Sequence, residues 1–138
     1  MASKASPLQI LKQEETSITT IKLRSDGIVH VHMKDNIVFG LDEQREHLYA
    51  CLQFVNGIKY PFMFTAGDYV NITKEARENA KKIDALLPRI GVALIVENLA
   101  YKLIAEFYQK FHKPELPTKI FSSEDKAVEW LLALPKRA

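Results

Sequence analysis

The feature that most constrains this chain is an alternation of short, β-rich runs with longer segments whose apolar residues repeat at helical spacing. Two β-rich runs come first, at residues 17–24 and 28–33, and the turn signal Ser25-Asp26-Gly27 separates them. Such a pair predicts an antiparallel hairpin. Three more short runs follow, at residues 60–65, 91–96 and 118–121. The first two of these three are apolar on both faces, as in a strand that is covered on both sides.

Four segments with helical spacing are predicted, at residues 41–55, 73–87, 98–111 and 122–134. Their apolar stripes are Leu41, Leu48, Leu52 and Val55; Ala76, Ala80, Ile83 and Leu87; Leu99, Leu103, Ile104, Phe107 and Phe111; and Ala127, Trp130, Leu131 and Leu134. Thr73 is a natural cap for the second helix. Ser122 and Asp125 have the spacing of a capping box for the last one.

The predicted order of elements is therefore β-β-α-β-α-β-α-β-α. Strands that alternate with helices form parallel sheets through right-handed crossovers. We therefore expect an α/β fold with a mixed five-stranded sheet that begins with an antiparallel hairpin. Residues 1–15 are predicted to be an N-terminal tail, in which Leu8, Ile10 and Leu11 could dock, and residues 16–138 to form one domain.

Composition narrows the class of partner and the location. A net charge of +2 does not favour binding to nucleic acid. No apolar run reaches the length of a membrane span, and residues 1–6 lack the apolar core of a signal peptide, so we expect a cytoplasmic protein. The single cysteine, Cys51, excludes a disulfide framework and any CxxC motif, and we expect it to pack as a small apolar residue.

The motifs of the common α/β enzymes are missing from the sequence. The five glycines form no GxG, and neither GxxxxGK[ST] nor GxSxG occurs. His30 and His32 share one face of a strand, which is compatible with metal ligation, but no third ligand is apparent. Asp68 and Glu97, at neighbouring strand ends, are the only candidates for an acid and a base, and such carboxylates more often begin helices. We therefore predict no enzyme, no metal and no cofactor.

Three stretches carry a family resemblance: Asn71 to Arg77 (NITKEAR), Val92 to Val96 followed by a helix that ends at Phe111-His112-Lys113-Pro114, and Lys119 to Phe121 followed by Lys126 to Leu131. In their order and spacing they resemble the STAS domains of the SpoIIAA-like fold, and most closely an uncharacterised bacterial branch of STAS/SEC14-like domains. The resemblance covers roughly residues 17–135. It implies a mixed sheet with most helices on one side.

The resemblance also implies a binding or regulatory role. In anti-anti-sigma factors of this fold, a serine in a DSSG-like turn before the second helix is phosphorylated. Here residues 65–73 are TAGDYVNIT, without DSSG. Thr73 is the nearest hydroxyl and is the candidate phosphosite, although a role as a helix cap is the favoured explanation.

The favoured hypothesis is a non-enzymatic binding or regulatory module whose partner is unknown. Open α/β sheets bind ligands beyond the carboxyl ends of their strands. The loop after residue 65 lies at such an end, and it offers Asp68, Tyr69, Asn71 and Thr73. Glu97 follows the neighbouring strand. These five residues are the candidate ligand or partner site.

The alternative is a domain that binds an apolar small molecule or a lipid. Phe62 and Phe64 point to one face of their strand and Met63 to the other, so both faces of the sheet are expected to be apolar. If helices cover only one face, the other needs a ligand, the segment of residues 8–11, or a second copy of the chain. The last of these would make the protein a homodimer, which we expect.

Overall fold

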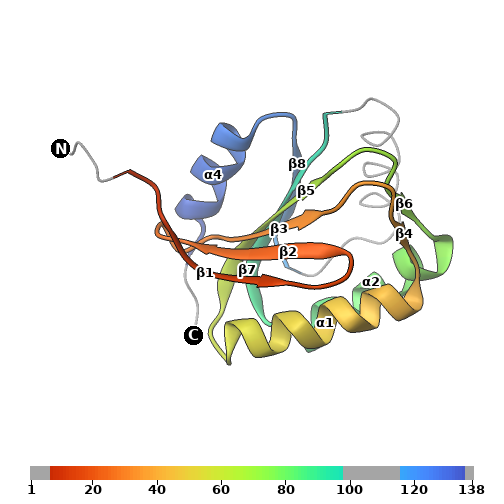
Figure 1. Ribbon diagram of the computed structural model, residues 1–138. Helices are drawn as coiled ribbons and strands as arrows, with labels where there is room; N and C mark the ends of the chain where they lie inside the picture. Colours follow the sequence, from red (N-terminus) through yellow and green to blue (C-terminus); the bar gives the residue numbers. More distant parts are fainter. Residues whose placement is uncertain (1–6, 98–115, 136–138) are drawn as a thin grey trace.

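A six-stranded mixed sheet runs through the chain and supports the other elements (Figure 1). The computed structural model describes residues 7–97 and 116–135. The strands, in their order across the sheet, are β1 (Ile10–Glu15), β2 (Thr19–Arg24), β3 (Val29–Met33), β5 (Tyr60–Ala66), β7 (Arg89–Ile95) and β8 (Thr118–Phe121). The first three pair antiparallel and the rest parallel. The predicted α/β class and the opening hairpin are therefore confirmed.

The sheet has one strand more than the sequence predicts. The additional strand is β1, which consists of residues assigned above to the N-terminal tail and pairs with β2. All six of its residues are exposed, so it lacks the apolar alternation that reveals a strand with a buried face. Lys12 anchors it, because its Nζ donates a hydrogen bond to the Phe54 carbonyl at 2.8 Å and lies 4.5 Å from the centre of the Phe54 ring.

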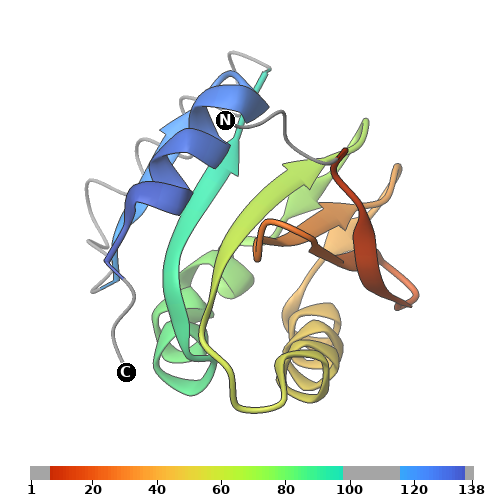
Figure 2. The ribbon, with the colours of Figure 1, turned by 90° about the vertical axis from the view of Figure 1, so that its left-hand side faces the viewer.

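Helices α1 (Leu41–Val55) and α2 (Lys74–Leu86) cover one side of the sheet (Figure 2). The core between them is apolar, with side chains from the strands and from α1: Ile21, Val29, Val31, Phe62, Val92, Leu48, Cys51, Phe54 and Val55. Cys51 is fully buried there, as predicted. The predicted helix over residues 98–111 lies outside the described residues.

The buried face of α1 differs from the predicted stripe. Leu41 is 44% exposed, whereas Gln44 and His47 are buried. These two polar residues are buried because they find hydrogen-bonding partners inside. Gln44 Nε2 donates to the Ala76 carbonyl at 2.8 Å, and His47 Nδ1 lies 3.4 Å from Thr19 Oγ1.

Helix α4 (Glu124–Ala133) lies on the opposite side of the sheet from α1 and α2 (Figure 2). It packs Ala127 and Leu131 against residues of the hairpin and the parallel strands, namely Ile28, Met63, Ala93 and Ile95. Ser123 caps it by accepting the Lys126 N–H at 3.5 Å, one residue later than the predicted capping box at Ser122 and Asp125. The shift follows from the helix beginning at Glu124.

The prediction of a second apolar face without cover is therefore wrong in two respects. Over β5, β7 and β8 that face is apolar, but α4 covers it. Over β2 and β3 the same face is polar, because Lys22, His30 and His32 alternate with the buried Ile21, Val29 and Val31.

A second, two-stranded parallel sheet lies beyond the carboxyl ends of β3 and β5. It consists of β4 (Val38–Phe39) and β6 (Asn71–Ile72), which are too short to be predicted from sequence. Its inner residues join a small apolar cluster: Ile18, Phe39 and Ala76, with Met33, Ile37 and Ile72.

Candidate functional site

The connections β3–α1 (residues 34–40) and β5–α2 (residues 67–73) lie side by side and form what we call the loop platform (Figure 1). Backbone hydrogen bonds link them at both ends. Asn36 N donates to the Asp68 carbonyl at 2.8 Å, and Thr73 N donates to the Phe39 carbonyl at 3.0 Å. Between these bonds lies the β4–β6 pair. The platform is thus a hydrogen-bonded surface at the carboxyl end of the parallel strands, where ligands of open α/β sheets bind.

Asp35 braces the turn that begins the second connection. Its Oδ1 accepts the Asp68 N–H at 2.8 Å, while Gly67 N donates to the Met33 carbonyl at 2.8 Å. A Cβ on Gly67 would lie 2.0 Å from Asp35 Oδ1, so any other residue would force the Asp35 carboxylate to move. The carboxylate and the glycine together fix the path of the chain into Tyr69.

Tyr69 has a backbone conformation that is unfavourable for a tyrosine. Its φ is 59°, and the only other non-glycine residues with positive φ in the described part of the chain are Asn36 and Asn56. Asparagine tolerates this region, whereas other L residues lose about 1 kcal/mol there. The Tyr69 side chain is 79% exposed, and the next residue, Val70, is buried. The backbone of Tyr69 is therefore strained, while its aromatic ring remains exposed to solvent.

Two further apolar side chains are exposed on the platform or directly after it. Val38, in β4, is 62% exposed and pairs with the exposed Asn71 of β6 on the outer face of the small sheet. Leu41, at the start of α1, is 44% exposed. Leu41 is the first residue of the helix and is exposed there, so it does not join the buried stripe of α1. The outer face of the platform therefore combines apolar and polar groups.

Thr73 ends the platform and caps α2, as predicted. Its Oγ1 accepts the Ala76 N–H at 3.1 Å. Thr73 and Glu43 both lie within 4 Å of the point where Gly40 would carry a Cβ. The hydroxyl is therefore half-buried, engaged in a hydrogen bond, and near a carboxylate.

Glu97 follows a different strand from the other four candidate residues. It is exposed, two residues beyond the end of β7. Within residues 7–97 and 116–135, no hydrogen bond or ion pair joins it to the loop platform. The structure thus brings together Asp68, Tyr69, Asn71 and Thr73, and it does not pair Asp68 with Glu97 as an acid and a base.

His47 and Cys51 form a buried polar pair under the platform. Their closest approach is 3.4 Å, between Nε2 and Sγ. Burial, assisted by the charge of Arg89, lowers the pKa of His47 to about 4. Burial also raises the pKa of the Cys51 thiol to about 12. Both groups are therefore neutral at pH 7, and a protonated thiol is a poor nucleophile.

A cluster of three polar residues, His30, His32 and Thr65, lies on the α4 side of the sheet, in the part that α4 does not cover. His30 Nε2 and His32 Nδ1 lie 2.7 and 2.8 Å from Thr65 Oγ1. Burial, with smaller contributions from the charges of Arg24, His32 and Lys22, lowers the pKa of His30 to about 4. Sequence reasoning found the two histidines but not Thr65, which is 35 residues from His30 and 33 from His32 and reaches them only through the β3–β5 pairing.

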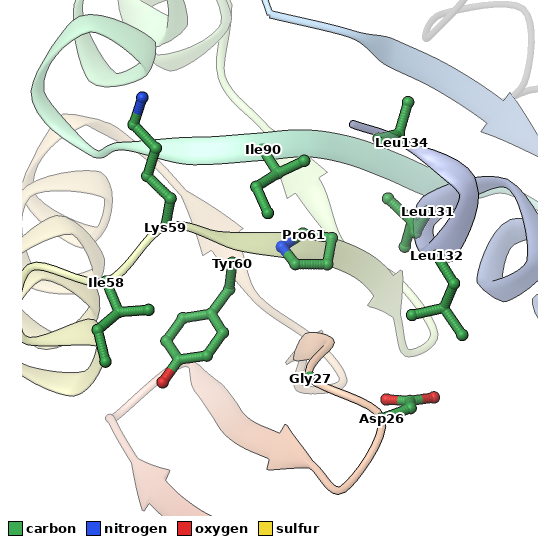
Figure 3. A pocket seen from close by; sticks show the side chains of 10 residues that line it. All are labelled: Asp26, Gly27, Ile58, Lys59, Tyr60, Pro61, Ile90, Leu131, Leu132 and Leu134. Atoms are coloured by element: carbon green, nitrogen blue, oxygen red, sulfur yellow. The ribbon is translucent and has the colours of Figure 1, made fainter. Parts of the chain in front are cut away.

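A shallow apolar hollow lies at the other end of the sheet, at the amino ends of β5 and β7. Its volume is about 270 Å³. Figure 3 shows it between the hairpin turn, the strand ends and α4, and its lining includes Ile58, Tyr60, Ile90 and Leu132. Cavities that hold drug-sized molecules are usually larger, at roughly 300–1,000 Å³.

Comparison with known proteins places the chain in a family. Residues 21–134 match the family described as a domain of unknown function, DUF7793. The chain belongs to this family. No curated protein is significantly similar to it in sequence.

A solved structure supports the fold of this DUF7793 domain. The crystal structure of an uncharacterized protein from the DUF3478 family of Shewanella loihica PV-4, with a SpoIIAA-like fold, superposes with a TM-score of 0.54. The two chains share 12% sequence identity, and the match covers 95% of this chain and 98% of the other. The domain therefore has a SpoIIAA-like fold, as its sequence resemblance implies.

No helix in residues 7–97 or 116–135 is long and apolar enough to cross a membrane. In the same part of the chain, no three side chains of His, Cys, Asp or Glu are grouped as metal ligands.

Proposed function

We propose that this DUF7793 domain is a non-enzymatic binding module that engages a protein partner through the outer face of the loop platform. Tyr69 is the proposed anchor of this surface, to which Val38 and Leu41 add exposed apolar groups and Asp68 and Asn71 add polar ones. Tyrosine is enriched among residues that dominate protein–protein binding energy, because its ring buries a large area and its hydroxyl forms a hydrogen bond.

The observation that carries the proposal is the left-handed conformation of Tyr69. A tyrosine with a φ of 59° loses stability that glycine or asparagine would keep, and its 79% exposed ring recovers none of it within the chain. Backbone strain of this kind concentrates at functional sites. Binding to a partner would recover the lost free energy, because the ring would then be buried.

The rigidity of the platform supports the same role. Asp35, Gly67 and the β4–β6 hydrogen bonds hold the turn in place, so little conformational entropy remains to be lost on binding. The buried His47–Cys51 pair, in contrast, lacks the thiolate and the access that a cysteine nucleophile requires.

Site-specific crosslinking tests the proposal. A photoreactive phenylalanine analogue is placed at position 69 of the full chain in the cells that naturally express it. Position 49 is the matched control, because Tyr49 is also exposed, at 63%, but lies on α1. We expect one dominant adduct from position 69 that is absent from position 49. The same adducts from both positions, or none from position 69, would contradict the proposal.

Phosphorylation of Thr73 stays a prediction. A phosphoryl group on Thr73 would remove the cap of α2 and add charge near Glu43, while the positive end of the helix dipole would favour it. A regulatory role requires that a kinase from the native cells phosphorylates the wild type and not Thr73→Ala. Mass spectrometry of the two chains after incubation with lysate and ATP makes this comparison.

A second candidate function is the binding of a small apolar molecule in the hollow that Figure 3 shows. The observation that favours it is the apolar lining, in which Ile58 is 53% and Leu132 is 45% exposed. Native mass spectrometry tests this function and the expected homodimer together, because it reports both bound molecules and the number of subunits. A ligand that is lost in Leu132→Ser would support this site, and a ligand retained there would contradict it.

A further inference from the structure

Two imidazoles and one hydroxyl converge on the polar half of the α4 side of the sheet, where all three residues are half-buried. His30 and His32 project from the same face of β3, and Thr65 is the direct neighbour of His32 on β5. The distances to Thr65 Oγ1 are 2.7 Å from His30 Nε2 and 2.8 Å from His32 Nδ1. The proposed function does not use these residues.

The hydrogen bonds within this cluster determine which of its atoms donate and which accept. A threonine hydroxyl has one hydrogen, so it can donate to only one of the two imidazoles and must accept from the other. The imidazole nitrogen that donates to the hydroxyl carries its ring's hydrogen, so that ring must change to its other tautomer before this nitrogen offers a lone pair. The two nitrogen–oxygen distances are close to the roughly 3 Å between adjacent ligands of a metal ion with bonds of about 2.0–2.2 Å. After the change of tautomer, a shift of the hydroxyl, on which both ring nitrogens now converge, would direct two imidazole lone pairs and one hydroxyl lone pair to one point.

We infer that His30, His32 and Thr65 form a surface site for a borderline divalent transition metal, with two imidazole ligands, one hydroxyl ligand and water in the remaining positions. Imidazole ligands without a neighbouring carboxylate favour Cu²⁺, Ni²⁺ and Zn²⁺ over Mg²⁺ and Ca²⁺. The site has fewer than three of the usual ligand side chains. The sheet compensates, because it holds two of them in fixed positions on one strand.

The charges around the cluster give the site a specific test. Arg24 is paired with Asp26 at 2.7 Å, and Lys34 with Glu15 at 2.8 Å. Lys22 lies directly opposite His30 in the β2–β3 register. No ion pair within the described ranges includes Lys22. Its positive charge opposes a bound cation and would attract a bound anion, so removing it has opposite effects on the two kinds of ligand.

Isothermal titration of the full chain without an affinity tag, with Zn²⁺ at neutral pH, tests the site. We expect one micromolar site and no binding of Mg²⁺. His32→Gln should weaken Zn²⁺ binding by about tenfold or more. Thr20→Val, the matched control that replaces the residue opposite His32 on β2, should leave the affinity unchanged. Lys22→Gln should tighten Zn²⁺ binding.

Two outcomes would overturn the inference. One is the absence of Zn²⁺ binding, or Zn²⁺ binding that His32→Gln leaves unchanged. The other is tight binding of inorganic phosphate that Lys22→Gln weakens while Zn²⁺ does not bind, since this would make the cluster an anion site. NMR of the wild type avoids any effect of substitution on folding. Zn²⁺ should shift the ring signals of His30 and His32 and leave those of the buried His47 unchanged.

Discussion

The two faces of the small β4–β6 sheet have the same backbone but different roles. On the inner face, Phe39 is 5% exposed and packs in a cluster with Ile18 and Ala76. On the outer face, Val38 is 62% exposed, and Tyr69, in the turn before β6, is exposed in a left-handed conformation. Packing of the inner face holds the loop platform in place. The exposed apolar groups of the outer face do not contribute to that packing. Exposed apolar groups on a rigid surface are what binding to a partner requires.

The largest expected contrast is in stability. Phe39→Ala should lower the free energy of unfolding by roughly 3–5 kcal/mol, because it removes a buried aromatic side chain. Val38→Ala, the adjacent residue on the outer face, should change it by less than about 0.5 kcal/mol. Urea denaturation of both variants measures the difference. Equal losses would show that the two faces are not distinct.

The inner face should also be sensitive to acid through His47, whose ring lies 6.2 Å from the Phe39 ring, centre to centre. The pKa of His47 is about 4 in the folded chain, below the value of about 6.5 in the unfolded chain. The unfolded chain therefore binds the proton first. Stability is complete above pH 6.5 and falls as the pH decreases toward 4, by roughly 2–3 kcal/mol at pH 4.5.

Comparison of the wild type with His47→Gln isolates this effect. The variant should lose the His47 part of the pH dependence between pH 7 and pH 4.5. It should retain the part that comes from other groups, including His30, whose pKa is also lowered. Urea denaturation at the two pH values gives the difference, and identical pH dependence in both proteins would contradict the assignment.

The brace beneath Tyr69 should produce a smaller loss. Gly67→Ala places a Cβ 2.0 Å from Asp35 Oδ1, so we expect a loss of roughly 1–3 kcal/mol. In an Asp35→Ala background the same substitution should cost less, because the clashing carboxylate is gone. A double-mutant cycle measures this coupling. Additive losses would mean that Asp35 does not set the path of the turn.

A still smaller loss of stability is expected at Thr73, where the platform joins α2. Thr73→Ala should cost about 1 kcal/mol, because the Ala76 N–H loses its side-chain acceptor. Thr73→Ser keeps the hydroxyl and should restore most of the stability. Thermal unfolding of the two variants, monitored by circular dichroism, makes the comparison. Equal stability of the serine and alanine variants would show that the Thr73 hydroxyl does not stabilise α2.

Periodicity predicted the parts of the fold that bury one regular face. The limits of α1 at residues 41 and 55 and the cap at Thr73 are as predicted, because apolar spacing and capping chemistry are local. The strands β1, β4 and β6 were not predicted, since an exposed edge strand and two-residue strands have no periodic pattern. The side of the sheet that α4 covers depends on contacts between distant residues, and sequence spacing does not report these.

The candidate site was predicted in composition but not in geometry. Strand order placed Asp68, Tyr69, Asn71 and Thr73 at a carboxyl end, which the structure confirms. The positive φ of Tyr69 depends on Asp35 and Gly67, which come together only in the fold. Val38 was missed because its exposure results from the β4–β6 pairing, and Thr65 because it reaches His30 and His32 only through the β3–β5 pairing.

Two exposed tyrosines provide the most direct test of the central claim. Tyr69→Ala and Tyr49→Ala remove equivalent side chains from the loop platform and from α1. Both should change the free energy of unfolding by less than about 0.5 kcal/mol. For the partner captured at position 69, we expect Tyr69→Ala to weaken the Kd by about tenfold or more and Tyr49→Ala to leave it unchanged. Equal affinity of both variants for that partner would contradict the claim that the loop platform is the binding surface.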